Sequence, residues 1–147
     1  QPKLKRGGNS AYTISYTGNN AEITNQITFH KELGIISVFN YTFIKFSQSN
    51  LLNLFQLVNE INHILNFYSL IIEVNEDVVA LRNEAQFSTL LLEADLLKDT
   101  LECGVVLLDQ FIPAINLVNY GVMGVEEAMD TAERLEHTQN MVEDMPN

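Results

Sequence analysis

The chain is poor in the residues that build covalent frameworks and aromatic binding platforms. It has one cysteine, no tryptophan, three prolines and three histidines in 147 residues. A single cysteine, Cys103, excludes an internal disulfide and a cysteine zinc cluster. Without tryptophan, and without a basic stripe interleaved with aromatic residues, the sequence lacks the stacking platform of proteins that bind single-stranded nucleic acid.

Positive charge is also scarce and unevenly placed. Eight Lys and Arg stand against nineteen Asp and Glu, for a net charge of −11. Residues 1–50 carry five basic and two acidic residues, net +3, and residues 51–147 carry three basic and seventeen acidic residues, net −14. Because a field of this sign repels phosphate backbones, we expect no nucleic-acid partner and favour neutral or basic protein partners.

Long uncharged apolar runs are missing as well. No run approaches the roughly 18 to 20 residues that span a bilayer, and the start, QPKLKRGGNS, lacks the apolar middle of a signal peptide. We therefore expect a soluble, cytoplasmic chain with no membrane contact. Its length and its 46% of hydrophobic residues suit one globular domain with a real core.

An alternating apolar pattern is present in the first third. Residues 1–10 show no period and contain Gly7-Gly8, which predicts a flexible lead before a single domain at 11–147. Alternation on either side of Gly18-Asn19-Asn20 predicts a hairpin. A second turn at 30–34 leads to a β-branched and aromatic strand at 35–44. These three strands form an antiparallel meander.

Helical and strand periods alternate after residue 50. The sequence predicts a helix at 51–66, a strand hairpin at 67–74 and 78–85, and a long helix at 88–120 that Gly121 ends. In the long helix, Asp109 and Pro113 are expected on the outer side. An amphipathic helix is expected from about residue 124. The order βββ-α-ββ-α-α predicts an α+β domain with a five-stranded antiparallel sheet and helices packed on it.

An ordered set of segments over residues 21–120 resembles a known family. The segments are ELGIISVFN, LLNLFQLVNEINHIL, NFYSLIIEVNED, VVALRNEAQF and LLDQFIPAINLVNYG. They resemble the bacterial YbjN-like domains, described as sensory transduction regulators, which share the fold of type III secretion chaperones. The resemblance implies a type III secretion chaperone-like fold and a non-enzymatic, protein-binding domain that often dimerises. The family usually opens with an amphipathic helix, which residues 1–17 do not supply.

The spacing of Glu60 and His63 raises the possibility of a metal site. Glu-x-x-His is the spacing of ligands in di-iron carboxylate bundles. At 100° per residue both side chains fall away from the apolar face of their helix, and neither His30 nor His137 supplies a second motif. We expect no metal, no cofactor and no catalytic residue. Two alternatives stay open: an enzyme or metal-binding protein that uses surface carboxylates and His63, and a structural domain of a larger protein.

Apolar residues exceed what one buried face requires. The helix at 51–66 has an apolar arc broader than one stripe, and the strand at 35–44 is apolar on both faces, with edges that could receive an extended peptide. The predicted partner-binding residues are Leu52, Leu57, Ile64, Ile35, Phe39, Tyr41 and Phe43. The sequence thus predicts a chaperone-like or regulatory module that holds a partner protein segment, and a homodimer. Asn62 is expected to turn toward the core and bind backbone groups of the following strand.

Overall fold

Six antiparallel strands form one sheet in the order β1-β2-β3-β4-β6-β5. The computed structural model describes residues 3–5, 9–86 and 94–133. The strands are β1 (Lys3–Lys5), β2 (Asn9–Thr17), β3 (Glu22–His30), β4 (Ile35–Phe43), β5 (Ser69–Glu73) and β6 (Val78–Gln86). The helices are α1 (Leu51–Ile64), α2 (Ala94–Asn119) and a third at 125–133, with short 3-10 turns η1 (Gln48–Asn50) and η2 (Val74–Glu76).

The α+β class and the antiparallel sheet are confirmed, with one addition to the five predicted strands. Lys3–Lys5, inside the stretch predicted as a flexible lead, pairs with the start of β2. Three residues are too few to show a period, and strand pairing depends on backbone groups that any sequence supplies. The predicted helix residues 88–93 and everything after residue 133 lie outside the described residues.

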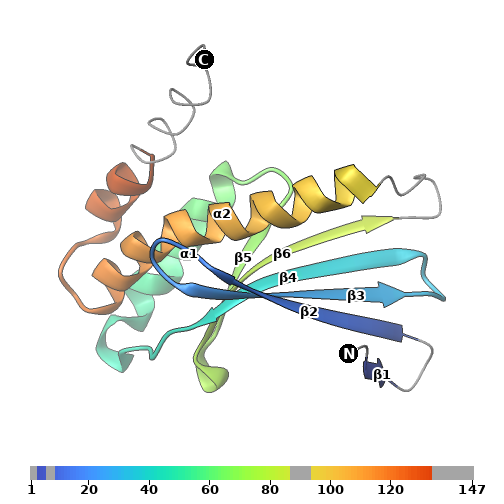
Figure 1. Cartoon of the computed structure of the whole chain (residues 1–147). Helices are drawn as coiled ribbons and strands as arrows, with labels where there is room; N and C mark the ends of the chain where they lie inside the picture. The colour runs from blue at the N-terminus through green and yellow to red at the C-terminus, as the bar shows by residue number, and fades with distance from the viewer. Residues whose placement is uncertain (1–2, 6–8, 87–93, 134–147) are drawn as a thin grey trace, which may run out of the picture.

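The described helices all lie on one side of the sheet (Figure 1). The buried side chains there form a large cluster and a small one. The large cluster joins α1, α2, the 125–133 helix and the β5–β6 end of the sheet, and includes Leu54, Leu57, Ile61, Leu81, Leu108 and Ile115. The small cluster lies under the start of α2 and consists of Ile27, Ile36, Val38 and Leu101. The helix side therefore holds the core, and none of the described helices covers the opposite side of the sheet.

A buried pair of asparagines separates the two clusters. Asn25 Nδ2 donates to Asn40 Oδ1 at 2.7 Å, and both residues are fully buried. Gly104 of α2 lies against this pair, because a Cβ atom at residue 104 would clash with Asn40 Nδ2. The helix thus comes close to the sheet at residue 104 because glycine has no side chain.

Tyr68 ties the segment before β5 to α2. Its hydroxyl donates to the Thr100 carbonyl oxygen at 3.2 Å. Burial raises the pKa of this hydroxyl, and the Cys103 thiol raises it further, against a smaller opposing effect of Asn83. The hydroxyl is therefore held in its neutral, donating form, which suits a structural contact.

The C-terminal end of α2 shows why Gly121 stops the helix. Gly121 has φ of 72°, in the left-handed region. Its N–H donates to the Val118 carbonyl at 3.1 Å, and the Val122 N–H donates to the Leu117 carbonyl at 2.9 Å. These two bonds form a Schellman motif, which satisfies carbonyls that have no partner within the helix. The predicted end of the helix is confirmed.

One carboxylate of α2 holds the β2–β3 turn. The Asp109 carboxylate accepts the backbone N–H groups of Asn19, Asn20 and Ala21 at 2.9 to 3.1 Å. Asp109 is buried, so its predicted place on the outer side of the helix is wrong. The periodicity of a helix predicts which side chains face the sheet. It does not predict that the distant β2–β3 turn covers another side of the helix and buries Asp109.

Pro113 is coupled to the same contact. A proline four residues after Asp109 has no N–H to give to the Asp109 carbonyl, so that oxygen loses its helical donor. Asn20 Nδ2 fills the position, with a 3.0 Å bond to Asp109 O. Asn20 of the turn therefore donates the hydrogen bond to the Asp109 carbonyl that residue 113 would donate in a regular helix.

The stretch Lys98–Asn119 of α2 is long and apolar enough to cross a membrane by length and composition alone. In this structure 56% of its apolar window is buried inside the protein. The core helix of a globular domain meets the same criterion, and α2 packs on β3, β4 and β6. We interpret α2 as the core helix of this domain.

Candidate protein-binding surfaces

The face of the sheet opposite the helices carries an apolar patch. Strand residues that lie opposite each other in register point to the same face. Tyr41 pairs with Ala80, and Ala80 pairs with Ile71 on the next strand. Phe43 pairs with Val78 in the adjoining row. We call Phe39, Tyr41, Phe43, Ile71 and Val78 the open-face patch.

The patch has a polar border and a defined aromatic geometry. The Tyr41 and Phe43 rings lie edge to face, with centroids 5.9 Å apart and planes at 85°. Phe43 is 71% exposed, and Phe39, Tyr41, Ile71 and Val78 are half-buried. Threonines and a glutamine of β3 lie on one side of it. On the other side, on β6, Arg82 lies directly opposite Phe39 and forms an ion pair of 3.9 Å with Glu84. An apolar centre with a polar rim is the composition of many protein interfaces.

The seven predicted partner-binding residues divide into three groups. Ile35, Phe39, Tyr41 and Phe43 share the open face of β4, as the alternation predicts. Leu52 and Ile64 are 72% and 39% exposed, near opposite ends of α1 and on the helix side of the sheet. Leu57 belongs to the core. The structure therefore places four of the seven on one face of the sheet, and three of these, Phe39, Tyr41 and Phe43, belong to the open-face patch.

The prediction for Leu57 as a surface residue is wrong. Its side chain is 0% exposed and belongs to the large core cluster. The helical wheel assumes one buried face, but α1 packs against both β5 and α2. Two neighbouring elements bury a wider arc than one sheet does, and Leu57 falls inside it.

The predicted addition of a peptide at the edges of the 35–44 strand is also wrong. β4 lies between β3 and β6 and pairs with both over most of its length. The long-range pairing with β6 follows from the path of the chain through α1, which no local pattern in residues 35–44 contains. Both edges of β4 are closed to another strand.

Asn62 occupies the free edge of β5. Its Nδ2 donates to the Leu70 carbonyl at 3.0 Å, and its Oδ1 accepts the Leu70 N–H at 2.7 Å. This agrees with the expected backbone partners in the following strand. The amide makes the two bonds that a residue of an added strand would make, which protects this edge from pairing with another chain.

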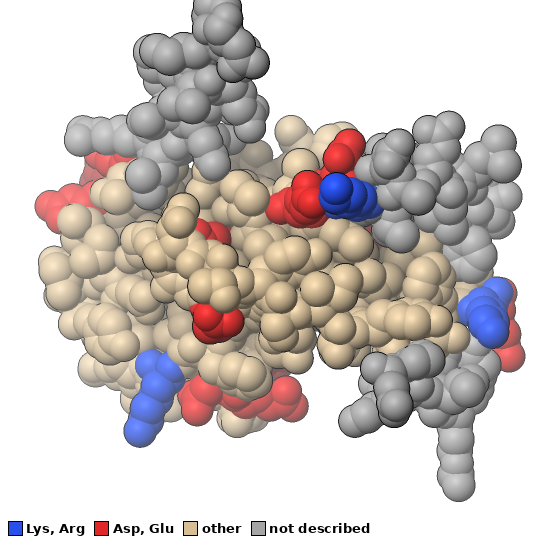
Figure 2. Space-filling view, viewed as in Figure 1, with Lys and Arg blue, Asp and Glu red and all other residues tan. Residues whose placement is uncertain are grey.

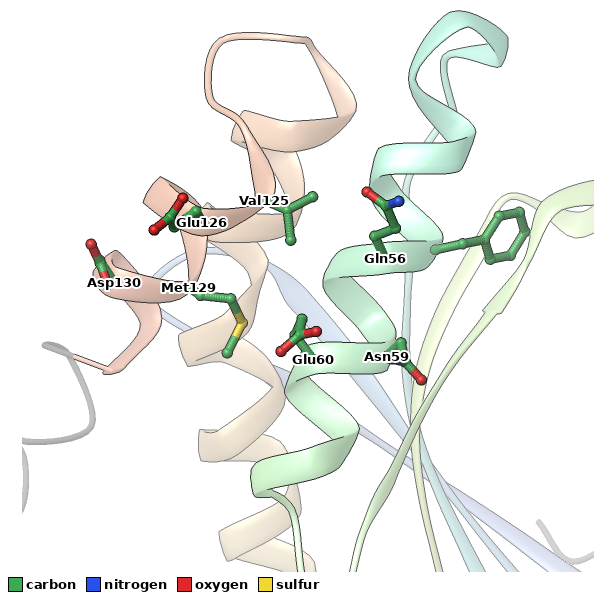
Figure 3. Close-up of a pocket in the computed structure, with 8 residues that line it drawn as sticks. Gln56, Asn59, Glu60, Val125, Glu126, Met129 and Asp130 are labelled. Carbon is green, nitrogen blue, oxygen red and sulfur yellow. The ribbon is translucent and has the colours of Figure 1, made fainter.

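A second surface lies between α1 and the 125–133 helix. The groove there has a volume of about 610 Å³ and is lined by Phe55, Gln56, Asn59, Glu60, Val125, Glu126, Met129 and Asp130. Figure 3 shows Glu60 and Met129 approaching each other from the two helices, with Gln56 and Val125 further along. Residues of the 125–133 helix are not among the predicted sites, because nothing local shows that this helix returns beside α1.

His63 and Glu60 are both exposed on α1, as predicted. In the part of the chain that the structure describes, no three His, Cys, Asp or Glu side chains come together as ligands for a metal ion. The Glu-x-x-His spacing thus places both side chains on the exposed surface of α1.

Comparison of the chain with family models, with curated proteins and with solved structures gave no match.

Proposed function

We propose that this chain is a non-enzymatic module that binds a segment of a partner protein on the open-face patch. The observation that carries the proposal is the row of aromatic side chains on a sheet face that none of the described helices covers. A sheet in a soluble domain ordinarily turns a polar face to water. Here Phe39, Tyr41 and Phe43 occupy that face instead, and contiguous exposed apolar surface marks interaction sites.

Two sequence observations favour the same class of function. The ordered segments that resemble YbjN-like domains suggest a chaperone-like or regulatory, cytoplasmic role without catalysis. The charge of −11 favours a neutral or basic partner over an acidic one. A second copy of the chain is also a candidate partner, and it would pair two patches face to face as stacked sheets do.

A pair of matched variants tests the proposal. Tyr41→Ser/Phe43→Ser removes the exposed centre of the patch. Phe67→Ser/Tyr120→Ser removes the same two residue types at positions 81% and 68% exposed and outside the patch. Light scattering at several concentrations and quantitative pull-down from native lysate compare both variants with the unchanged chain.

We expect the patch variant alone to lose its partner or its self-association. A chain that stays monomeric at all concentrations and retains no protein would contradict the proposal. Equal binding by the patch variant and the unchanged chain would contradict it as well.

A further inference from the structure

The groove between α1 and the 125–133 helix combines an apolar centre with carboxylates that have no basic partner among the described residues. The 125–133 helix docks through Ala128 and Ala132, which are 0% and 3% exposed. The small alanine side chains let the helix backbone lie close to the core. Val125 and Met129 of the same helix are partly buried against the core and line the groove together with residues of α1. Val125 and Met129 therefore supply apolar surface to the groove.

The two walls of the groove match in length. Each helix contributes residues at positions i, i+1, i+4 and i+5, from Phe55 to Glu60 on α1 and from Val125 to Asp130 on the other helix. Five residue steps along a helix span about 7.5 Å. This length accommodates two or three residues of extended chain at roughly 3.3 Å each.

The described residues that line the groove carry charge of one sign. Glu60, Glu126 and Asp130 are among them, and no Lys or Arg of the described part of the chain lines the groove. The Lys and Arg ion pairs within the described residues join Arg82 to Glu84 and Lys98 to Glu102, so none of the three groove carboxylates has a Lys or Arg partner there. They do not converge as metal ligands. Carboxylates spread along an apolar groove suit separate cationic side chains better than a single ion.

We propose that this groove binds a short segment of a partner protein in which an apolar side chain is flanked by Lys or Arg. The apolar side chain contacts Val125 and Met129, and the basic side chains reach Glu60 on one wall and Glu126 or Asp130 on the other (Figure 3). The inference rests on the proposed protein-binding function. It adds a second contact site on the side of the sheet opposite the open-face patch, with its own charge specificity.

The test uses a defined peptide and a readout at each residue. The ¹⁵N-labelled chain is titrated with the peptide Gly-Lys-Leu-Lys-Gly, with Gly-Glu-Leu-Glu-Gly and with Gly-Lys-Ser-Lys-Gly, and backbone amide shifts are followed. We expect the Lys-Leu-Lys peptide to move amides within 55–60 and 125–130, and to bind more weakly as salt screens the charges. The acidic and serine peptides are expected to bind at least several-fold more weakly.

A charge-matched pair of variants separates the groove from general acidity. Glu60→Gln/Glu126→Gln/Asp130→Asn is expected to weaken binding about 4- to 25-fold, because the two Lys of the peptide form two exposed ion pairs that each contribute roughly two- to fivefold. Glu73→Gln/Glu76→Gln/Asp77→Asn removes the same charge at the exposed β5–β6 turn and is expected to leave binding unchanged.

Amide shifts spread over the acidic surface, equal binding of the acidic peptide, or equal losses in both triple variants would each overturn the inference. The three peptides test it on the unchanged chain, so it stays testable even if the groove variant folds poorly. The Tyr41→Ser/Phe43→Ser variant is expected to bind the peptide normally. Loss of groove binding with an intact open-face interaction would refute this inference and leave the proposed function standing.

Discussion

Several asparagine side chains in this protein act as substitutes for backbone groups. Asn62 pairs with both polar groups of Leu70. Asn119 Oδ1 accepts a hydrogen bond from the Ser47 N–H at 2.9 Å, and Asn119 Nδ2 donates to the Lys45 carbonyl at 2.9 Å. These two bonds fix the chain between β4 and α1. An amide has the donor and acceptor of a peptide group, so it satisfies backbone atoms where the regular pairing ends. These residues position the elements that carry both candidate surfaces.

Asn62→Ala should lower the free energy of unfolding by about 2 kcal/mol, because it removes two hydrogen bonds of roughly 1 kcal/mol each. Urea denaturation measures the change. Asn53→Ala, at an exposed position of the same helix, is the control and should stay within about 0.5 kcal/mol of the unchanged chain. Equal small effects at both positions would show that Asn62 does not hold the edge of β5.

The contact among Asn20, Asp109 and Pro113 predicts a coupling that a double-mutant cycle measures. Asn20→Ala should cost about 1 to 2 kcal/mol, since Asn20 Nδ2 donates to the Asp109 carbonyl and carboxylate. In a Pro113→Ala background, the new N–H at residue 113 supplies the Asp109 carbonyl. We expect the cost of Asn20→Ala to fall there by about 1 kcal/mol. Additive costs would contradict the coupling.

Gly104 sets the distance between α2 and the sheet, and its substitution tests that packing. Gly104→Ala places a Cβ atom against Asn40, so we expect a loss of about 1 to 3 kcal/mol in unfolding free energy. In an Asn40→Ala background the clash is gone, and alanine should instead stabilise the helix by about 1 kcal/mol. Thermal melts of the four proteins measure this change of sign. Stabilisation by Gly104→Ala alone would mean that the contact is loose.

Elements with strong local signals could be predicted from the sequence, and their arrangement could not. The Gly18-Asn19-Asn20 turn, the alternation of β2 to β4 and the stop at Gly121 are all local features, and all are found. The insertion of β6 between β4 and β5 depends on pairing across α1. The local pattern of residues 35–44 therefore predicts a strand with free edges, whereas β4 lies inside the sheet between β3 and β6.

The candidate surfaces could be predicted in part for the same reason. The alternation in 35–43 is a local signal, and it is enough to place Phe39, Tyr41 and Phe43 on one face of their strand. Ile71 and Val78 lie on the same face because of the register between β4, β6 and β5. That register depends on long-range pairing and cannot be predicted from the strands separately. The groove needs the position of the 125–133 helix, which depends on tertiary packing.

At the scale of the whole molecule, the two candidate surfaces lie on opposite sides of the sheet. The open-face patch is apolar and aromatic, and the groove is apolar with carboxylates on its walls. In the view of Figure 2, uncharged residues cover most of the surface and the acidic residues stand in separate groups. Salt screens interactions between exposed charges beyond about 8 Å, so the groove carboxylates act at short range.

Site-specific photo-crosslinking tests the central claim most directly. A benzophenone amino acid replaces Phe43, in the patch, or Phe67, which is 81% exposed and outside it, and each protein is irradiated in native lysate. The account predicts a discrete crosslinked product from position 43, with a partner protein or with a second copy of the chain, and none from position 67. No product from position 43, or the same products from both positions, would contradict binding at the open face of the sheet.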